Sequence, residues 1–207
     1  KGLGNLMDGL YNDPGERIIG DIDLLVPEAD FLKAVATLVD LGYQSSVRIY
    51  DDPEKEMHYP PLYHPEEPAN VEIHRIPVAS AYTGSFSVAV LLAEKKTVTG
   101  RTGCLVPSDR HKVIHTFLHS EVMNHGHAFR HLSFRALYDL LLLSQRTRVA
   151  DLPPLTGYPG KTKDWLALAG KLMDCPGKFF PDGQNPSRKY EYWFDLSLEF
   201  PRLNEFL

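Results

Sequence analysis

Residues 17–26 read Arg-Ile-Ile-Gly-Asp-Ile-Asp-Leu-Leu-Val, and this apolar run predicts a buried strand. Side chains two positions apart in a strand share a face, so Asp21 and Asp23 are expected to project together. Adjacent carboxylates repel each other, and burying them without a partner costs roughly several kcal/mol. A cation between them removes that cost. Solvated aspartates at the mouth of a loop are the alternative that this stretch leaves open.

A second informative stretch, residues 70–76, reads Asn-Val-Glu-Ile-His-Arg-Ile and also predicts a strand. Alternation places Val71 and Ile73 on one face, whereas Glu72 and His74 share the other. A Glu-x-His pair by itself is typical of a solvated strand face, and that alternative stays open. Because an Asp-x-Asp strand comes first in the chain, Glu72 becomes a candidate third carboxylate.

Asp21, Asp23 and Glu72 together offer the oxygen ligands that Mg²⁺ prefers. Two such ions would activate an attacking hydroxyl and stabilise the pyrophosphate that leaves a nucleoside triphosphate. In this scheme Asp21 and Asp23 hold the metals. Glu72 completes the site of the ion that binds the nucleophile and is the candidate general base.

The bulk properties are those of an ordinary globular protein. The 207 residues suit one domain or two small ones, with 43% hydrophobic and 24% charged residues. The net charge of −5 gives no argument for a nucleic-acid partner. Cys104 and Cys175 lie far apart in the sequence, which favours reduced thiols in the cytoplasm. No apolar run approaches the roughly 20 residues that span a bilayer, so no membrane partner is expected.

The pattern of apolar residues and helix caps predicts an α+β fold, in which strands with flanking helices are followed by a helical lobe. From Pro107 onward only helices are predicted, whereas the residues before it are predicted to form both strands and helices. The chain therefore divides into an α/β domain, residues 1–106, and a helical domain, residues 107–207. A strand is also predicted over 43–50 and a hairpin over 97–106. Helices are predicted over residues 1–11, 28–41, 87–95, 109–124, 129–146, 162–173 and 188–198.

Two further patterns lie in the predicted helical half. His111, His115 and His119 follow an i, i+4, i+8 spacing, which permits zinc binding by two of them, although no His-Glu-x-x-His arrangement is present. A polar helix face is the simpler interpretation. Arg135 and Asp139, four residues apart, are most simply an ion pair on the surface of a helix.

The sequence resembles a known family in both carboxylate strands. Gly20-Asp21-Ile22-Asp23-Leu24-Leu25-Val26 and Val71-Glu72-Ile73-His74-Arg75 are similar to motifs of the nucleotidyltransferase superfamily typified by DNA polymerase beta. The likeness is closer to a bacterial group described as uncharacterised nucleotidyltransferases, and it covers about residues 1–146. The further matches are Lys1-Gly2, Arg17, Leu41-Gly42-Tyr43 and Pro60-Pro61-Leu62-Tyr63-His64.

The resemblance implies a nucleotidyltransferase-like mixed sheet with flanking helices. It also implies Lys1 and Gly2 near the nucleotide phosphates, with Arg17 on a phosphate or on a carboxylate of the metal site. A structural ion pair is the alternative for Arg17. His74 would form a hydrogen bond with such a carboxylate or contact substrate. Alternatively, it is a packed strand residue. The implied cofactor is Mg²⁺, as two ions, or Mn²⁺, and the implied partners are an NTP and an acceptor, which is a small molecule, a protein or an RNA end.

Superfamily members place a strand and a glycine-containing turn ahead of the Asp-x-Asp strand, so the N-terminal element is expected to be truncated in this chain. The alternatives to a transferase are a non-catalytic nucleotide- or partner-binding module with a vestigial site, and a metal-dependent phosphohydrolase.

Overall fold

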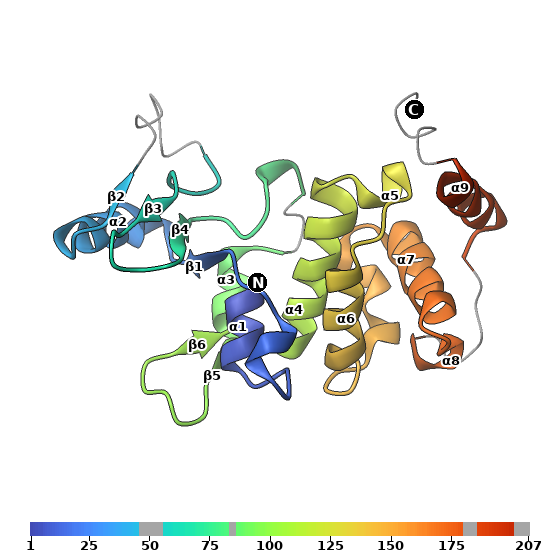
Figure 1. Ribbon diagram of the computed structural model, residues 1–207, viewed down its shortest axis with the longest axis horizontal. Coiled ribbons are helices and arrows are strands. Elements are labelled where there is room, and N and C mark those ends of the chain that lie inside the picture. The colour runs from blue at the N-terminus through green and yellow to red at the C-terminus, as the bar shows by residue number, and fades with distance from the viewer. Residues whose placement is uncertain (46–55, 83–85, 180–185, 201–207) are drawn as a thin grey trace. The chain divides into compact units, whose positions relative to one another are not determined.

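The computed structural model describes residues 1–45, 56–82, 86–179 and 186–200, and the fold is α+β, as predicted (Figure 1). The chain divides into two compact units, Lys1–Ser108 and Asp109–Leu207. The first unit contains two sheets and several helices, whereas the described residues of the second form helices and no strand. The domain boundary between residues 106 and 107 stays a prediction, because a compact unit need not fold independently.

A four-stranded mixed sheet is the centre of the first unit. Its strands lie in the order β1 (Asp21–Leu25), β4 (Asn70–His74), β3 (Leu62–Tyr63) and β2 (Gln44–Ser45). β1 is parallel to β4, whereas β3 is antiparallel to both β4 and β2. The strand predicted over 43–50 is therefore described only in its first part, since residues 46–50 lie outside the described residues.

The prediction that the first strand is buried was wrong. β1 lies at one edge of the sheet; Asp21 and Leu24 are exposed, and its other three residues are half-buried. Leu24 is 42% exposed, because an edge strand is covered by a neighbouring strand along one side only. This position also leaves Asp21 open to solvent, whereas Asp23 is half-buried.

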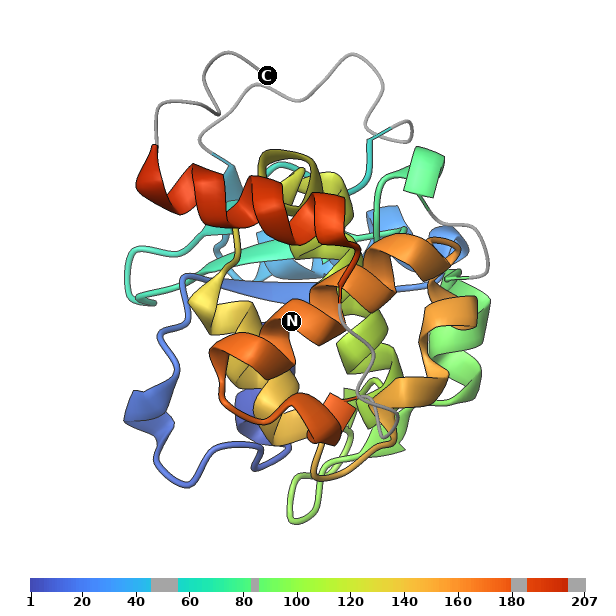
Figure 2. The same cartoon turned by 90° about the vertical axis from the view of Figure 1, so that its right-hand side faces the viewer.

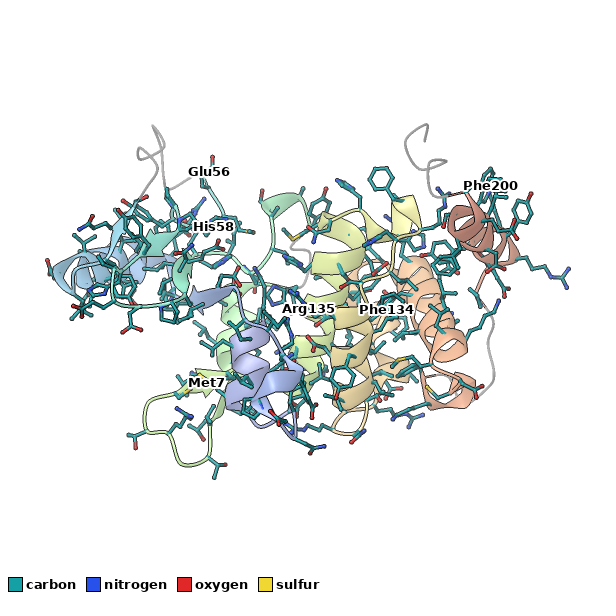
Figure 3. The ribbon with its side chains drawn as sticks, viewed as in Figure 1. Met7, Glu56, His58, Phe134, Arg135 and Phe200 are labelled. Carbon is teal, nitrogen blue, oxygen red and sulfur yellow. The ribbon has the colours of Figure 1, made fainter. Side chains whose placement is uncertain are left out.

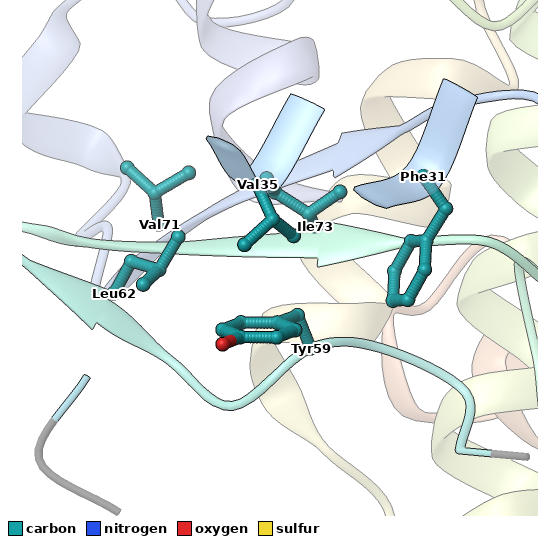
Figure 4. Close-up of a cluster of buried hydrophobic side chains, with 6 residues drawn as sticks. All are labelled: Phe31, Val35, Tyr59, Leu62, Val71 and Ile73. Atoms are coloured by element: carbon teal, nitrogen blue, oxygen red, sulfur yellow. The ribbon is translucent and has the colours of Figure 1, made fainter. Parts of the chain in front are cut away.

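The core of the first unit lies between the sheet and α2 (Phe31–Asp40). Val71 and Ile73 of β4 both point into it, because alternate residues of a strand share a face. Burying such a side chain stabilises the fold by about 1.5–3 kcal/mol. Glu72 and His74 are consequently directed to the opposite face. The buried cluster consists of Phe31, Val35, Tyr59, Leu62, Val71 and Ile73 (Figure 4).

Smaller elements complete the first unit. β5 and β6 pair in antiparallel fashion, which confirms the predicted hairpin. The Oγ of Ser87 accepts a hydrogen bond from the Val90 amide at 3.4 Å and so caps α3. An ion pair of 2.7 Å between Lys96 and Asp8 joins this hairpin to the segment after α1. The bounds are α1 (Gly2–Met7), α3 (Val88–Ala93), β5 (Lys96–Thr97) and β6 (Leu105–Val106).

The second unit packs its helices around buried aromatic and aliphatic side chains, among them Phe117 and Trp165, whose ring centroids lie 5.5 Å apart. Its final helix, α9, is drawn in red in Figure 2. In the described part of the chain, no helix is both long and apolar enough to cross a membrane. The helices are α4 (Asp109–Phe117), the π-helical turn Leu118–Met123, α5 (Gly126–Phe129), α6 (Phe134–Leu143), α7 (Pro159–Leu172), α8 (Pro176–Phe179) and α9 (Arg188–Glu199).

The single helix predicted over 129–146 was wrong at its start. Arg130 adopts a left-handed backbone conformation with a φ of 55°, which ends α5. The next helix, α6, begins after Ser133, whose Oγ accepts a hydrogen bond from the Ala136 amide at 3.3 Å. His125 is also left-handed, with a φ of 56°, so a short strained segment separates the π-helical turn from α6.

Candidate metal centre

The register between β1 and β4 sets the arrangement of the carboxylates. The two parallel strands pair Asp23 with Glu72 and Leu25 with His74. Ile22 packs against the core, so Asp23 points to the opposite face, which is also the face of Glu72 and His74. Two carboxylates therefore meet as direct cross-strand neighbours, and such a pair of like charges is unfavourable unless a cation or a proton donor lies beside it.

His74 supplies the first group that compensates these charges. Its Nε2 lies 2.9 Å from Asp23 Oδ1 and 3.3 Å from Glu72 Oε2. The residue is only 3% exposed, so its ring is buried on this face of the sheet. One ligand atom from each of Asp23, Glu72 and His74 lies within 4.8 Å of the others. The three side chains thus converge on one point.

Lys1 supplies the second compensating group. Its Nζ lies 2.7 Å from Asp23 Oδ1. Burial by itself would raise the pKa of the Asp23 carboxyl, but the hydrogen bond from His74 and the charge and hydrogen bond of Lys1 hold that pKa well below its usual range. Asp23 is therefore ionised at neutral pH, which is the state in which a carboxylate binds a metal ion.

Asp21 does not belong to this converging group. It pairs with Asn70 in the strand register, is exposed, and is absent from the set of three described side chains that are close enough to share an ion. Its predicted role as a metal ligand stays a prediction. His74, by contrast, belongs to the converging group, although the scheme of three carboxylates did not include it as a metal ligand.

The residues expected near the nucleotide phosphates lie at the same end of the unit. A Cβ atom at Gly2 would come within 3.0 Å of Arg17 Nη2, so the guanidinium of Arg17 lies directly against Gly2. Arg17 Nη1 also donates a hydrogen bond of 2.6 Å to the carbonyl oxygen of Ile18. The structure thus brings Gly2 to Arg17 and Lys1 to Asp23, whereas their contacts with a triphosphate stay predictions.

His58 is a residue of this region that the sequence did not indicate (labelled in Figure 3). It forms an antiparallel β-bridge with His74, and the centroids of the two rings lie 4.9 Å apart. Its Nδ1 lies 2.9 Å from the carbonyl oxygen of Tyr59. This pairing joins the segment before β3 to the end of β4. The proline-rich composition of residues 58–68 is typical of an extended segment but does not identify its partner.

The donor set fits a divalent cation. Two carboxylate oxygens and one imidazole nitrogen are ligands that Mg²⁺, Mn²⁺ and Zn²⁺ use in different proportions. Asp23 is ionised, and Asp23 and Glu72 can each supply a negative charge to the ion. Asp23, Glu72 and His74 are therefore the residues that would hold a metal in this unit.

The other polar patterns behave differently. His111 is buried, and His115 and His119 contact each other edge to face at 6.4 Å. No group of three or more metal-ligating side chains is found at this stripe among the described residues, and two-histidine zinc binding stays a prediction. The predicted surface position was wrong for Asp139, which is buried in α6, whereas its ion pair with Arg135 stays a prediction.

Comparison with models of protein families identifies the family of the chain. The sequence model of a family described as "Uncharacterised nucleotidyltransferase" matches residues 1–155. No curated protein and no solved structure matches the chain. The matched region covers well over half of the chain and includes both strands of the candidate metal centre.

Proposed function

Because the chain belongs to the family of uncharacterised nucleotidyltransferases, we propose that it moves a nucleoside monophosphate from an NTP to a hydroxyl of an acceptor, with release of pyrophosphate. The observation that carries this proposal is the cross-strand pairing of Asp23 with Glu72 beside the buried His74. A small molecule, a protein and an RNA end all offer a suitable hydroxyl. The net charge of −5 disfavours a long nucleic acid as the acceptor.

The carboxylates divide the work of the reaction. Asp21 and Asp23 hold the Mg²⁺ ions, which when bound offset the charge of the triphosphate and make the acceptor hydroxyl more acidic. Glu72 accepts the proton of that hydroxyl as its oxygen attacks the α-phosphorus. The bond between the α-phosphorus and the bridging oxygen breaks, and pyrophosphate leaves with that oxygen.

Basic groups near β1 orient the triphosphate. The planar guanidinium of Arg17 can contact two phosphate oxygens at once, and Gly2 gives the phosphates close access because it has no side chain. Lys1 moves between Asp23 and the phosphates, because its ammonium is a single charge on a flexible stem. His74 Nε2 lies beside both Asp23 and Glu72, so this imidazole belongs to the same centre.

Pyrophosphate release from each NTP, in the presence of Mg²⁺ and candidate acceptors, tests the proposal. Asp23→Asn and Glu72→Gln should each lower the rate by at least about a hundredfold, the lower end of the effect of a positioned acid or base. Asp40→Asn is the matched control, because Asp40 is exposed at the end of α2. Equal turnover by Asp23→Asn and wild type would contradict the assignment.

The two rival functions give different products in the same assay. A phosphohydrolase would release inorganic phosphate without any acceptor, whereas the proposed transferase consumes acceptor and releases pyrophosphate. A non-catalytic module would bind NTP and Mg²⁺ without turnover, which calorimetric titration detects. Acceptor-dependent pyrophosphate release therefore supports the transferase against both rivals.

A further inference from the structure

We propose that His74 is a direct ligand of the catalytic cation and that it makes the centre selective for Mn²⁺ over Mg²⁺. The inference rests on the proposed function in one respect, since the ion is the one that Asp23 and Glu72 would hold. It adds the class of metal and a ligand that the three-carboxylate scheme does not include.

The distances from His74 Nε2 to the two carboxylates are close to those of a ligand sphere. Donors bound to one ion at about 2.1 Å, with angles near those of an octahedron or a tetrahedron, lie roughly 3.0–3.4 Å apart. His74 Nε2 lies 2.9 Å from Asp23 Oδ1 and 3.3 Å from Glu72 Oε2. An ion placed between the three residues therefore needs only small movements of these side chains.

The surroundings of His74 hold its ring in this orientation. The residue is 3% exposed, and its backbone belongs to β4. The ring of His58 lies 4.9 Å away, centroid to centroid, and contacts the imidazole from one side. Nε2 cannot turn toward bulk water without disturbing this packing, so an ion bound by Asp23 and Glu72 would meet the imidazole nitrogen.

The chemistry of the nitrogen donor gives the selectivity. Mg²⁺ prefers oxygen ligands and waters, whereas first-row transition ions gain affinity from imidazole. A buried imidazole between two carboxylates therefore favours Mn²⁺, and it adds little to the binding of Mg²⁺. Lys1, whose Nζ lies 2.7 Å from Asp23 Oδ1, is the cationic group that the ion would displace.

A positioning role is the competing explanation of the same distances. In that role the Nε2–H group of His74 donates to both carboxylates and never contacts the ion. His74→Gln separates the two roles, because the glutamine amide can still donate a hydrogen bond but offers no imidazole nitrogen. A positioning residue would tolerate this change, whereas a ligand would not.

Titration of the protein with Mn²⁺ alone, followed by electron paramagnetic resonance, is the decisive experiment. In wild type, the electron spin echo of bound Mn²⁺ should show nitrogen modulation from an imidazole. Both His74→Gln and Asp23→Asn should lose that modulation. The Mn²⁺ dissociation constant of His74→Gln should rise by at least about tenfold, the lower end of what even outer-shell partners contribute. Its affinity for Mg²⁺, measured by competition, should stay unchanged.

His64→Gln is the matched control. His64 lies in the same unit, and its Nδ1 accepts a hydrogen bond from the Glu66 amide at 3.2 Å, which does not involve the carboxylates. This variant should keep the nitrogen modulation and the affinity of wild type. Modulation that is absent from wild type, or that survives in His74→Gln at unchanged affinity, overturns the inference. The wild-type spectrum gives this answer even where a variant fails to fold.

The test also separates this inference from the proposed function, since no nucleotide is added. Nitrogen-ligated Mn²⁺ in wild type supports the inference, even in a protein that turns over no NTP. The converse pair of results is that His74→Gln binds Mn²⁺ as wild type does, while wild type releases pyrophosphate in the presence of acceptor. That pair of results refutes the ligand role of His74 and leaves the transferase assignment standing.

Discussion

Two carboxyl groups that are shielded from solvent, Asp23 in the first unit and Glu121 in the second, differ strongly in pKa. The side chain of Asp23 is 11% exposed, and its pKa is held well below the usual range. Glu121 is 1% exposed, and burial raises its pKa to about 7. Burial disfavours the charged form of both groups, so the difference comes from their partners.

The partners of Asp23 are cationic or proton-donating groups. Lys1 and His74 approach its Oδ1 to 2.7 Å and 2.9 Å. Among the described residues, Glu121 has one such contact, from Ser120 Oγ to Oε1 at 3.0 Å. A carboxyl that stays ionised suits a metal centre, whereas the burial of Glu121 favours its protonated form, which suits a structural role.

The sharpest contrast should appear in the pH dependence of folding. The pKa of Glu121 is about 7 in the folded chain, and its ordinary value is 4.5, so the folded state binds this proton more tightly. The stability that this proton provides is complete below about pH 4.5 and is lost as the pH rises through about 7. The total loss is on the order of 3 kcal/mol. Denaturant unfolding of wild type at about pH 5 and about pH 8 measures it.

Glu121→Gln should remove this component and be the more stable protein at the alkaline end. Glu67→Gln, at an exposed position, is the control and should follow the wild-type curve. A curve for Glu121→Gln that falls as steeply as that of wild type would show that Glu121 is not the group that titrates.

Gly126 should be the next most sensitive position. A Cβ atom there would lie 2.6 Å from the carbonyl oxygen of Ser120 and 2.8 Å from that of His131, and these backbone atoms cannot move cheaply. Gly126→Ala should lower the free energy of unfolding by about 2–3 kcal/mol. Gly160→Ala, where no atom lies within 4 Å, should be neutral or stabilising by up to about 1 kcal/mol. Similar melting temperatures for the two variants would contradict the close packing around Glu121.

Removal of the hydroxyl beside Glu121 should have a smaller effect. Ser120→Ala deletes the contact with Oε1 and should cost about 1 kcal/mol. It should also raise the pKa of Glu121 further, because this hydrogen bond lowers it, and so move the midpoint of the stability–pH curve upward. Ser197→Ala removes a comparable serine hydroxyl that donates to the Phe194 carbonyl, and it should leave the midpoint in place. An unmoved midpoint in Ser120→Ala would mean that Ser120 does not influence Glu121.

The smallest effect on stability is expected at Lys1, whose side chain is 23% exposed, because such ion pairs contribute about 0–1 kcal/mol. Lys1→Gln should nevertheless raise the pKa of Asp23 toward its ordinary value, and carboxyl ¹³C chemical shifts measured against pH detect this directly. Lys95→Gln, whose ammonium bonds the Leu92 carbonyl, is the control. An unchanged titration of Asp23 would exclude Lys1 as a significant partner.

The sequence indicated the surroundings of Asp23 much better than those of Glu121. Strand alternation and the family resemblance together placed Asp23 and Glu72 on one face, because a two-residue period depends only on local geometry. Asp21 shares that period but lies exposed, since the position of β1 at the sheet edge is a tertiary property.

Glu121 and the break at Arg130 were not predictable in the same way. The apolar spacing of residues 109–146 is compatible with long helices, and the π-helical turn leaves no mark in that spacing. His125 and Arg130 adopt left-handed conformations on either side of α5, whose first residue, Gly126, lies close to the backbone oxygens of Ser120 and His131. Patterns of local sequence do not indicate such contacts. His58 was missed for the same reason, since its contact with His74 joins residues 16 positions apart.

Calorimetric titration of a divalent cation into wild type, Asp23→Asn and Glu121→Gln tests the central claim most directly. An ionised carboxylate paired with Glu72 should bind the ion, so Asp23→Asn should weaken binding by at least about tenfold. Glu121→Gln should bind as wild type does, because its carboxyl lies in the other unit and is absent from the converging ligand group. Binding of wild-type strength by Asp23→Asn would contradict the assignment of this centre.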